Sequence, residues 1–372
     1  MQPTNNSIRA GDHRSYFSYK YLFISLLLSI SSLALVLYLT YTPDGFQHLK
    51  LKRLPGLFIA FFVAVLKVWF SAAKIRFLAD KQIGWWASVR VVLAWDFASA
   101  ITPSTIGGAP LGTYVMTREN ITLGKSSAIV LYGLLLDQFF YMIAIPVLLI
   151  SAIYIDVVPE NVGWVGEGVM LVIYALLMGY GLLLGYGLLR DPGSLKKVLR
   201  YLFTLPVLNR MKVKIEPELD NLVNKSEELR KKPPSFLIKG FMLSNMVWLC
   251  KIWLPTIVVL SFLPADELLS FMRSLAMMLA SLFMPTPGGS GGVEGLFAIF
   301  QGPLMERQVF LGIAIFMWRL ITYYLSIPVG MFVMSWYVNK SVIDSYSTLA
   351  GREKAQAAET DDDELTNVSE DG

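Results

Sequence analysis

The sequence has few of the side chains that build most metal and catalytic centres. Its 372 residues include one cysteine, Cys250, and two histidines, His13 and His48. A single cysteine excludes an internal disulfide and a cysteine metal site. Both histidines lie in polar flanks outside the apolar runs, which argues against a histidine-ligated metal. We therefore expect no metal and no cofactor.

Charge is scarce as well. Only 16% of the residues are charged and 55% are apolar, whereas soluble proteins average about a quarter charged. This composition predicts a polytopic, all-α membrane protein. Cys250 lies inside an apolar segment, but these segments contain no catalytic centre built from histidine, from cysteine with a partner or from paired acids. The polar stretches contain no nucleotide-binding glycine loop. We expect neither an enzyme nor a nucleic-acid partner.

Long apolar runs predict six membrane crossings, at residues 21–41, 54–73, 126–153, 162–189, 236–262 and 308–337. Residues 1–20 are basic, and the insertion 190–235 holds 11 Lys and Arg against 6 Asp and Glu. Positive loops stay in the cytoplasm, so both termini and the insertion are predicted there, within the cytoplasmic membrane. The insertion either reflects this topology alone or also contacts anionic headgroups. Residues 339–372 form an acidic tail that we expect to be disordered.

The apolar sequence is interrupted between residues 284 and 296, where a membrane helix would otherwise continue. Proline and glycine cannot extend a helix. Broken backbone is tolerated at membrane depth only where protein or a water-filled cavity satisfies its polar groups. The interruption is therefore a candidate working site, formed by Pro285, Pro287, Gly288, Gly289, Gly291 and Gly292.

The same combination of a Thr-Pro pair and a Gly-Gly pair occurs once more, upstream. Thr102-Pro103 precedes Gly107-Gly108 at the spacing that separates Thr286-Pro287 from Gly291-Gly292. Such paired interruptions point to a repeat-built transporter with its site between the repeats. Segment lengths and loop charges predict two re-entrant hairpins that enter from opposite faces, as an inverted repeat requires. The alternative is two unrelated kinked helices, and we favour the repeat.

Glu294 follows the second break, and Arg319 lies in the last predicted crossing. Either charge alone would be expensive in a bilayer, so we expect them to pair. The helix after the second break begins with unpaired N–H groups that suit an anion, such as a lipid phosphate. Arg319 would contact that phosphate and Glu294 a headgroup amine. A purely structural ion pair is the alternative, and we favour the functional interpretation.

Four other charges interrupt apolar segments. Asp96 either has an ionic partner or a protonation role, or it is a helix cap or a hydrogen-bonded packing residue. Asp137 lies beside Gln138, and it either forms a hydrogen bond to a neighbouring helix or lines a cavity. Lys67 marks a site or extends to the interface, and Lys251 lies inside the fifth run. We include Asp96 and Asp137 among the candidate substrate-binding residues.

These motifs carry a family resemblance. Residues 285–294 with Arg319 and Gly330, together with residues 102–114, resemble the signatures of the lysylphosphatidylglycerol synthase transmembrane, flippase-like family, over roughly residues 20–338. The resemblance implies a likeness to the flippase portion of the bacterial multiple peptide resistance factor, which moves aminoacylated phospholipid. That factor's aminoacyl-transfer domain has no counterpart here, so we do not expect synthesis of such a lipid.

The sequence therefore predicts a flippase-like protein that moves a phospho- or glycolipid with a polar headgroup between leaflets. Its expected partners are membrane lipids with an anionic or amine-bearing headgroup. A homo-oligomer or a lipid-modifying enzyme is a further possible partner. The alternative function is a non-transporting scaffold or accessory subunit for an enzyme that modifies lipids or glycans.

Overall fold

The computed structural model describes residues 54–102, 108–190, 230–262, 264–284, 286–305 and 308–337, with scattered positions at 23–38 and 193–228. Every regular element in this part of the chain is a helix, so the all-α prediction is confirmed. The predicted segments 1–20 and 339–372, and most of 190–235, lie outside the described residues.

Five described helices are long and apolar enough to cross a membrane. They are α2 (Leu54–Leu78), α5 (Leu123–Tyr154), α6 (Gly163–Gly185), α9 (Pro234–Phe262) and a last helix that begins as α12 (Gln308–Arg319). The last helix continues through the π-helical η7 (Leu320–Tyr324) and residues 326–337. These five lie within a few residues of the predicted crossings. The predicted crossing at 21–41 lies largely outside the described residues, although its described positions are helical.

Two pairs of shorter helices occupy the positions of the predicted hairpins. The first hairpin consists of α3 (Trp85–Ile101) and α4 (Gly108–Arg118). The second hairpin consists of α10 (Glu267–Ser281), the short turn η5 (Pro287–Gly289) and α11 (Gly292–Gln301), followed by η6 (Gly302–Leu304). A helix rises about 1.5 Å per residue and the bilayer core is about 30 Å thick, so no arm is long enough to cross it.

Local chemistry explains where both hairpins break. Thr102 ends α3 in an extended conformation with ψ 144°, and Thr286 is extended with ψ 149°. Each threonine precedes a proline, whose ring disfavours the helical region for the residue before it. The two Thr-Pro pairs thus impose the same local geometry on the two halves of the chain.

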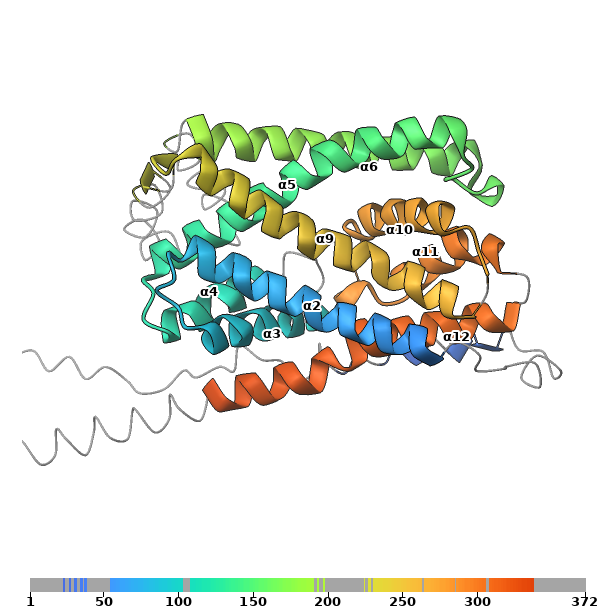
Figure 1. Ribbon diagram of the computed structural model, residues 1–372, viewed down its shortest axis with the longest axis horizontal. Coiled ribbons are helices and arrows are strands. Elements are labelled where there is room, and N and C mark those ends of the chain that lie inside the picture. Colours follow the sequence, from blue (N-terminus) through green and yellow to red (C-terminus); the bar gives the residue numbers. More distant parts are fainter. Residues whose placement is uncertain are drawn as a thin grey trace, which may run out of the picture.

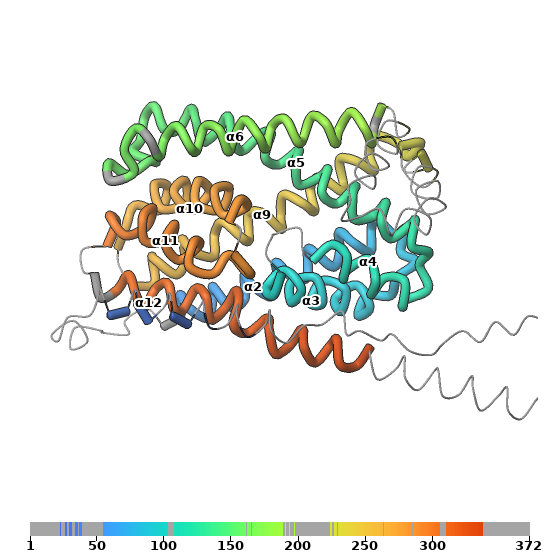
Figure 2. The backbone as a smooth tube through the Cα atoms, turned by 180° about the vertical axis from the view of Figure 1, so that it is seen from behind, coloured from blue at the N-terminus to red at the C-terminus, as the bar shows by residue number. Residues whose placement is uncertain are grey.

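The two hairpins lie at opposite ends of the molecule, as Figures 1 and 2 show. At the end that carries the first hairpin, Lys125 donates to Gln82 at 2.8 Å and Lys232 pairs with Asp80 at 2.7 Å. At the other end Arg273 of α10 donates to the Asp156 carbonyl, which follows α5. Each hairpin turns back near the middle, where α3 contacts η5.

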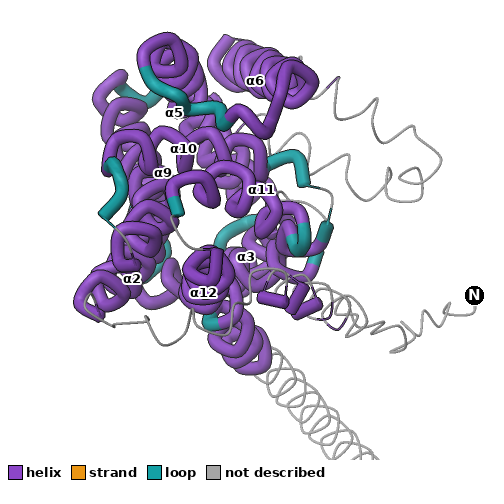
Figure 3. Tube along the Cα trace, turned by 90° about the vertical axis from the view of Figure 1, so that its right-hand side faces the viewer, coloured by secondary structure: helices purple, strands orange, loops and turns teal. Residues whose placement is uncertain are grey.

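The buried apolar side chains form two clusters, one around each hairpin. The last helix contributes to both: Phe310 and Trp318 belong to the cluster around the second hairpin, and Tyr323 and Tyr337 to the cluster around the first. The helix changes cluster between Trp318 and Tyr323, where it becomes π-helical. α2 packs along α9, and α6 lies at the edge of the bundle against α5 (Figure 3).

Candidate functional site

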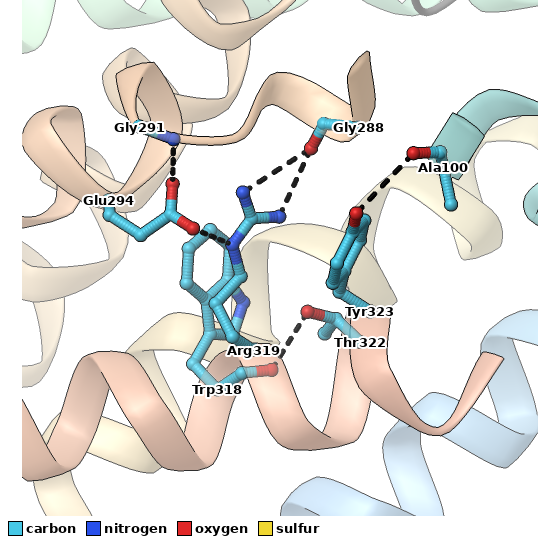
Figure 4. Close-up of polar contacts among 8 residues, drawn as sticks. All are labelled: Ala100, Gly288, Gly291, Glu294, Trp318, Arg319, Thr322 and Tyr323. Carbon is cyan, nitrogen blue, oxygen red and sulfur yellow. Dashed lines mark hydrogen bonds and ion pairs between the residues drawn. The ribbon is translucent and has the colours of Figure 1, made fainter. Parts of the chain in front are cut away.

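The tips of the two hairpins touch beside the last helix. Tyr323 donates its hydroxyl to the carbonyl of Ala100 in α3 at 3.4 Å, and Gly288 lies against both (Figure 4). A Cβ atom at Gly288 would lie 2.4 Å from the Tyr323 ring and 2.9 Å from the Ala100 oxygen. Its φ of +60° is also a left-handed conformation. Only glycine satisfies both conditions, so this contact explains the residue type.

Glu294 and Arg319 form an ion pair in the interior, as expected. The Arg319 Nε donates to Glu294 Oε1 at 2.8 Å, and the two side chains are 6% and 0% exposed (Figure 4). α11 supplies the acid in its first turn, and the last helix supplies the base at the end of α12. The desolvation of both charges is offset only if their remaining donors and acceptors find partners.

Those partners come from the broken backbone. The two terminal nitrogens of Arg319 donate to the Gly288 carbonyl at 3.2 and 3.3 Å, and Glu294 Oε2 accepts from the Gly291 N–H at 2.9 Å. The guanidinium also lies 4.8 Å from the centre of the Tyr323 ring. The carboxylate of Glu294 thus occupies the start of α11, which is where we expected a lipid phosphate. The pair fixes the break and the last helix together.

Asp96 and Asp137 belong to a separate polar cluster. Lys67 of α2 pairs with Asp96 of α3 at 2.6 Å, so it does not extend to the interface. Lys74, about two helical turns further along the same face of α2, pairs with Asp137 of α5 at 2.8 Å. Ser244 of α9 donates to the same carboxylate oxygen at 2.9 Å. This cluster therefore ties α2 to α3, α5 and α9.

The other predicted site residues have mixed surroundings. Thr102 donates to its own helix at the Ala98 carbonyl, and Gly108 packs against Trp95 of α3. In the second break, Gly289 lies against Val293 and Gly292 against Met284, whereas a Cβ at Gly291 would meet nothing within 4 Å. Pro103, Gly107 and Pro285 lie outside the described residues.

Sequence reasoning missed Lys74, Ser244 and Tyr323. The sequence did indicate a role for Lys74, because a lysine near the end of an apolar crossing is expected to pair with a buried acid on a neighbouring segment. Glu294 also had an unused signal, since a glutamate three residues after a helix start reaches back to the backbone N–H there. No sequence pattern marks Tyr323.

The fold and the site define a polytopic helical membrane protein in which two broken hairpins meet beside a buried ion pair. Comparison with known proteins agrees with this class. The model of the family described as "Lysylphosphatidylglycerol synthase TM region" matches residues 22–330, which include both breaks. The chain belongs to this family. It is also 24% identical over 328 residues to a UPF0104 membrane protein of Archaeoglobus fulgidus, covering 86% of this chain and 97% of that protein.

The glycines of the second break should differ in their effects on stability. Gly288→Ala introduces backbone strain of about 1–3 kcal/mol and a clash with the Ala100 carbonyl, so it should be the most destabilising. Gly291→Ala, with φ +84° but open space around the Cβ, should show the strain alone. Gly295→Ala is the control: it lies inside α11 and should gain about 1 kcal/mol. Denaturant unfolding in detergent micelles measures the order, and equal losses at Gly288 and Gly295 would contradict it.

The ion pair should behave as part of the break rather than as an isolated pair. Glu294→Gln and Arg319→Gln should each destabilise by roughly 3–5 kcal/mol, since each leaves a buried charge without its partner. The double variant should recover only part of this loss, because the Gly288 carbonyl loses both Arg319 donors. The exposed pair Lys232 and Asp80 is the control and should contribute under about 1 kcal/mol. Full recovery in the double variant would show that the backbone contact is dispensable.

Proposed function

We propose that this protein moves a polar-headed lipid between the leaflets of the cytoplasmic membrane. The observation that carries the proposal is the meeting of the two broken hairpins, which approach from opposite ends and touch at Gly288, Tyr323 and Ala100. In transporters built from inverted repeats, broken helices meet at the substrate site near the bilayer midplane. The equivalent Thr-Pro geometry and the separate hydrophobic cluster around each hairpin support such a repeat.

Charge at this depth supports the same proposal. Ionisable side chains within membrane segments are costly and mark substrate or ion pathways. Here Lys67, Asp96, Lys74 and Asp137, with Ser244, join α2, α3, α5 and α9 on the side of the first hairpin. Glu294 and Arg319 hold the second hairpin. A headgroup that passes between the hairpin tips would find polar partners that the hydrocarbon core lacks. We retain the breaks, Asp96, Asp137, Glu294 and Arg319 as candidate lipid contacts.

The proposal includes an orientation. We place the end that carries the first hairpin in the cytoplasm, since Arg76, Lys81 and the basic insertion connect helices there. Both hairpins are then re-entrant, and both termini are cytoplasmic.

Cysteine labelling in intact cells tests this orientation. On a Cys250→Ala background, an impermeant thiol reagent should label Glu160→Cys and leave Asp80→Cys unlabelled, because these residues lie at opposite ends of the bundle. Permeabilised cells provide the control, in which both positions should react. The reverse pattern in intact cells would invert the topology and place the first hairpin outside.

Transport itself is tested in liposomes that contain fluorescent lipids with different headgroups. The full-length protein should accelerate the exchange of at least one headgroup class between leaflets, relative to protein-free liposomes. Gly291→Leu should remove this activity by blocking headgroup approach. Gly295→Leu controls for added bulk, since a Cβ at either glycine meets nothing within 4 Å, and Gly291→Ala controls for the strain of a side chain at φ +84°; both should retain activity. A well-folded protein that exchanges no lipid class would instead favour the scaffold or accessory role.

A further inference from the structure

Lys251 extends the polar cluster and has no acidic partner among the described residues. Lys251 lies in α9, and its ammonium nitrogen is 4.1 Å from the centre of the Trp248 ring one turn earlier. It interacts electrostatically with Lys67, Asp137, Asp96 and Lys74. No carboxylate of the described residues lies within ion-pair distance of it. The cluster thus contains three lysines and two aspartates, and one positive charge is in excess.

The nearby carboxylates are already engaged. Asp96 accepts from Lys67 at 2.6 Å, and Asp137 accepts from both Lys74 at 2.8 Å and Ser244 at 2.9 Å. If either aspartate moved to Lys251, it would leave another lysine unpaired at the same depth. The excess charge is therefore a property of the whole cluster, and rearranging its side chains does not remove it.

A second donor beside Lys251 also lacks an acceptor. The Trp248 side chain is 4% exposed, and its indole N–H has no hydrogen-bond partner among the described residues. Its ring is held by stacking on Phe140 at 5.5 Å and by an edge contact with Tyr141 at 4.9 Å. A buried indole N–H usually finds a partner. Neighbouring turns of α9 thus present an ammonium and an N–H donor, both without an acceptor in the part of the chain that the structure describes.

We propose that Lys251 and Trp248 bind the phosphate group of a membrane lipid. An anionic oxygen would neutralise the excess charge and accept from both donors, as charge-assisted hydrogen bonds do. Lys251 retains some accessible surface, and the Lys67 and Asp96 side chains remain 17% and 27% exposed, so an anion can approach from this side of the cluster. The Trp248 N–H is covered in this conformation, so a headgroup must shift the side chains around it to reach it. The Glu294–Arg319 pair is less suited, because its charges already satisfy each other and the break. This inference rests on the proposed function and gives the headgroup its chemistry.

The test is lipid binding, measured by native mass spectrometry of the delipidated full-length protein. Phosphatidylglycerol is the probe, and monoglucosyl diacylglycerol, which has no phosphate, is the comparison lipid. Lys251→Met should weaken phosphatidylglycerol binding by roughly tenfold to a hundredfold, the range for a hydrogen bond to a charged group. Lys251→Arg should retain binding. Lys239→Met, which removes an exposed lysine near the start of the same helix, is the matched control and should bind as the parent does.

Thermal unfolding separates loss of the site from loss of the fold. Without lipid, Lys251→Met should unfold at or above the parental temperature, because it removes an uncompensated charge. Lys67→Met should unfold lower, because it leaves Asp96 unpaired. Added phosphatidylglycerol should then raise the unfolding temperature of the parent but not of Lys251→Met.

Three outcomes would overturn the proposal. Parental phosphatidylglycerol binding by Lys251→Met would assign Lys251 to packing on Trp248. Equal binding of the phosphate-free glycolipid would remove phosphate from recognition. Equal stabilisation by inorganic phosphate at matched concentration would assign the site to a free anion rather than a lipid. Because binding is measured without transport, a protein that binds phosphatidylglycerol through Lys251 but moves no lipid would refute the proposed function alone.

Discussion

The backbone between Pro287 and Gly292 is the feature on which the rest of the structure depends. A carbonyl or N–H without a partner costs several kcal/mol where no water is present. Arg319 satisfies the Gly288 carbonyl, Glu294 satisfies the Gly291 N–H, and the two side chains neutralise each other. Each of these contacts requires the next, since an arginine placed to reach the carbonyl would itself be unpaired without the glutamate. The break, α11 and the last helix are therefore fixed in one register.

That register determines how the two halves meet. Because Arg319 is bound to the second hairpin, Tyr323, four residues later, is carried to the tip of the first, at Ala100. The intervening turn is π-helical, a form often found at functional sites. Further along, Gly330 packs so closely against α3 that a Cβ would lie 2.9 Å from the Leu93 carbonyl. One helix thus joins two hydrophobic clusters that have separate interiors.

Much of this arrangement follows from local sequence. Long apolar runs predict crossing helices, because lipid demands about 20 apolar residues, and Thr102-Pro103 and Thr286-Pro287 predict the breaks because proline forces the preceding residue to be extended. The partner of each buried charge is harder to predict from the sequence, because Lys67 and Asp96 are 29 residues apart and Lys74 and Asp137 are 63 apart. The cost of a buried charge says that a partner exists without saying which.

The expectation of a phosphate at the start of α11 left out one contact that the structure shows, from the Gly291 N–H to Glu294. It counted the N–H groups that a helix start exposes but not the acid three residues later, which the same electrostatics attracts to them. A helix start attracts an anion, and here the Glu294 carboxylate already accepts from the Gly291 N–H. Donors and acceptors within the chain thus satisfy part of a helix start before any ligand can bind there.

Charged side chains in the interior fall into two kinds, those whose donors and acceptors are satisfied within the protein and those that are not. A group that must bind and release a headgroup needs a bound state better than its free state, so it cannot be fully satisfied by the protein alone. Glu294 and Arg319 satisfy each other and the backbone, which suits them to hold the shape of the break and makes them the weaker of the candidate lipid contacts. Lys251 is different, because the carboxylates around it are held by other lysines. If the protein moves a lipid, the residue with the unmet charge is the one whose energy changes when the lipid arrives.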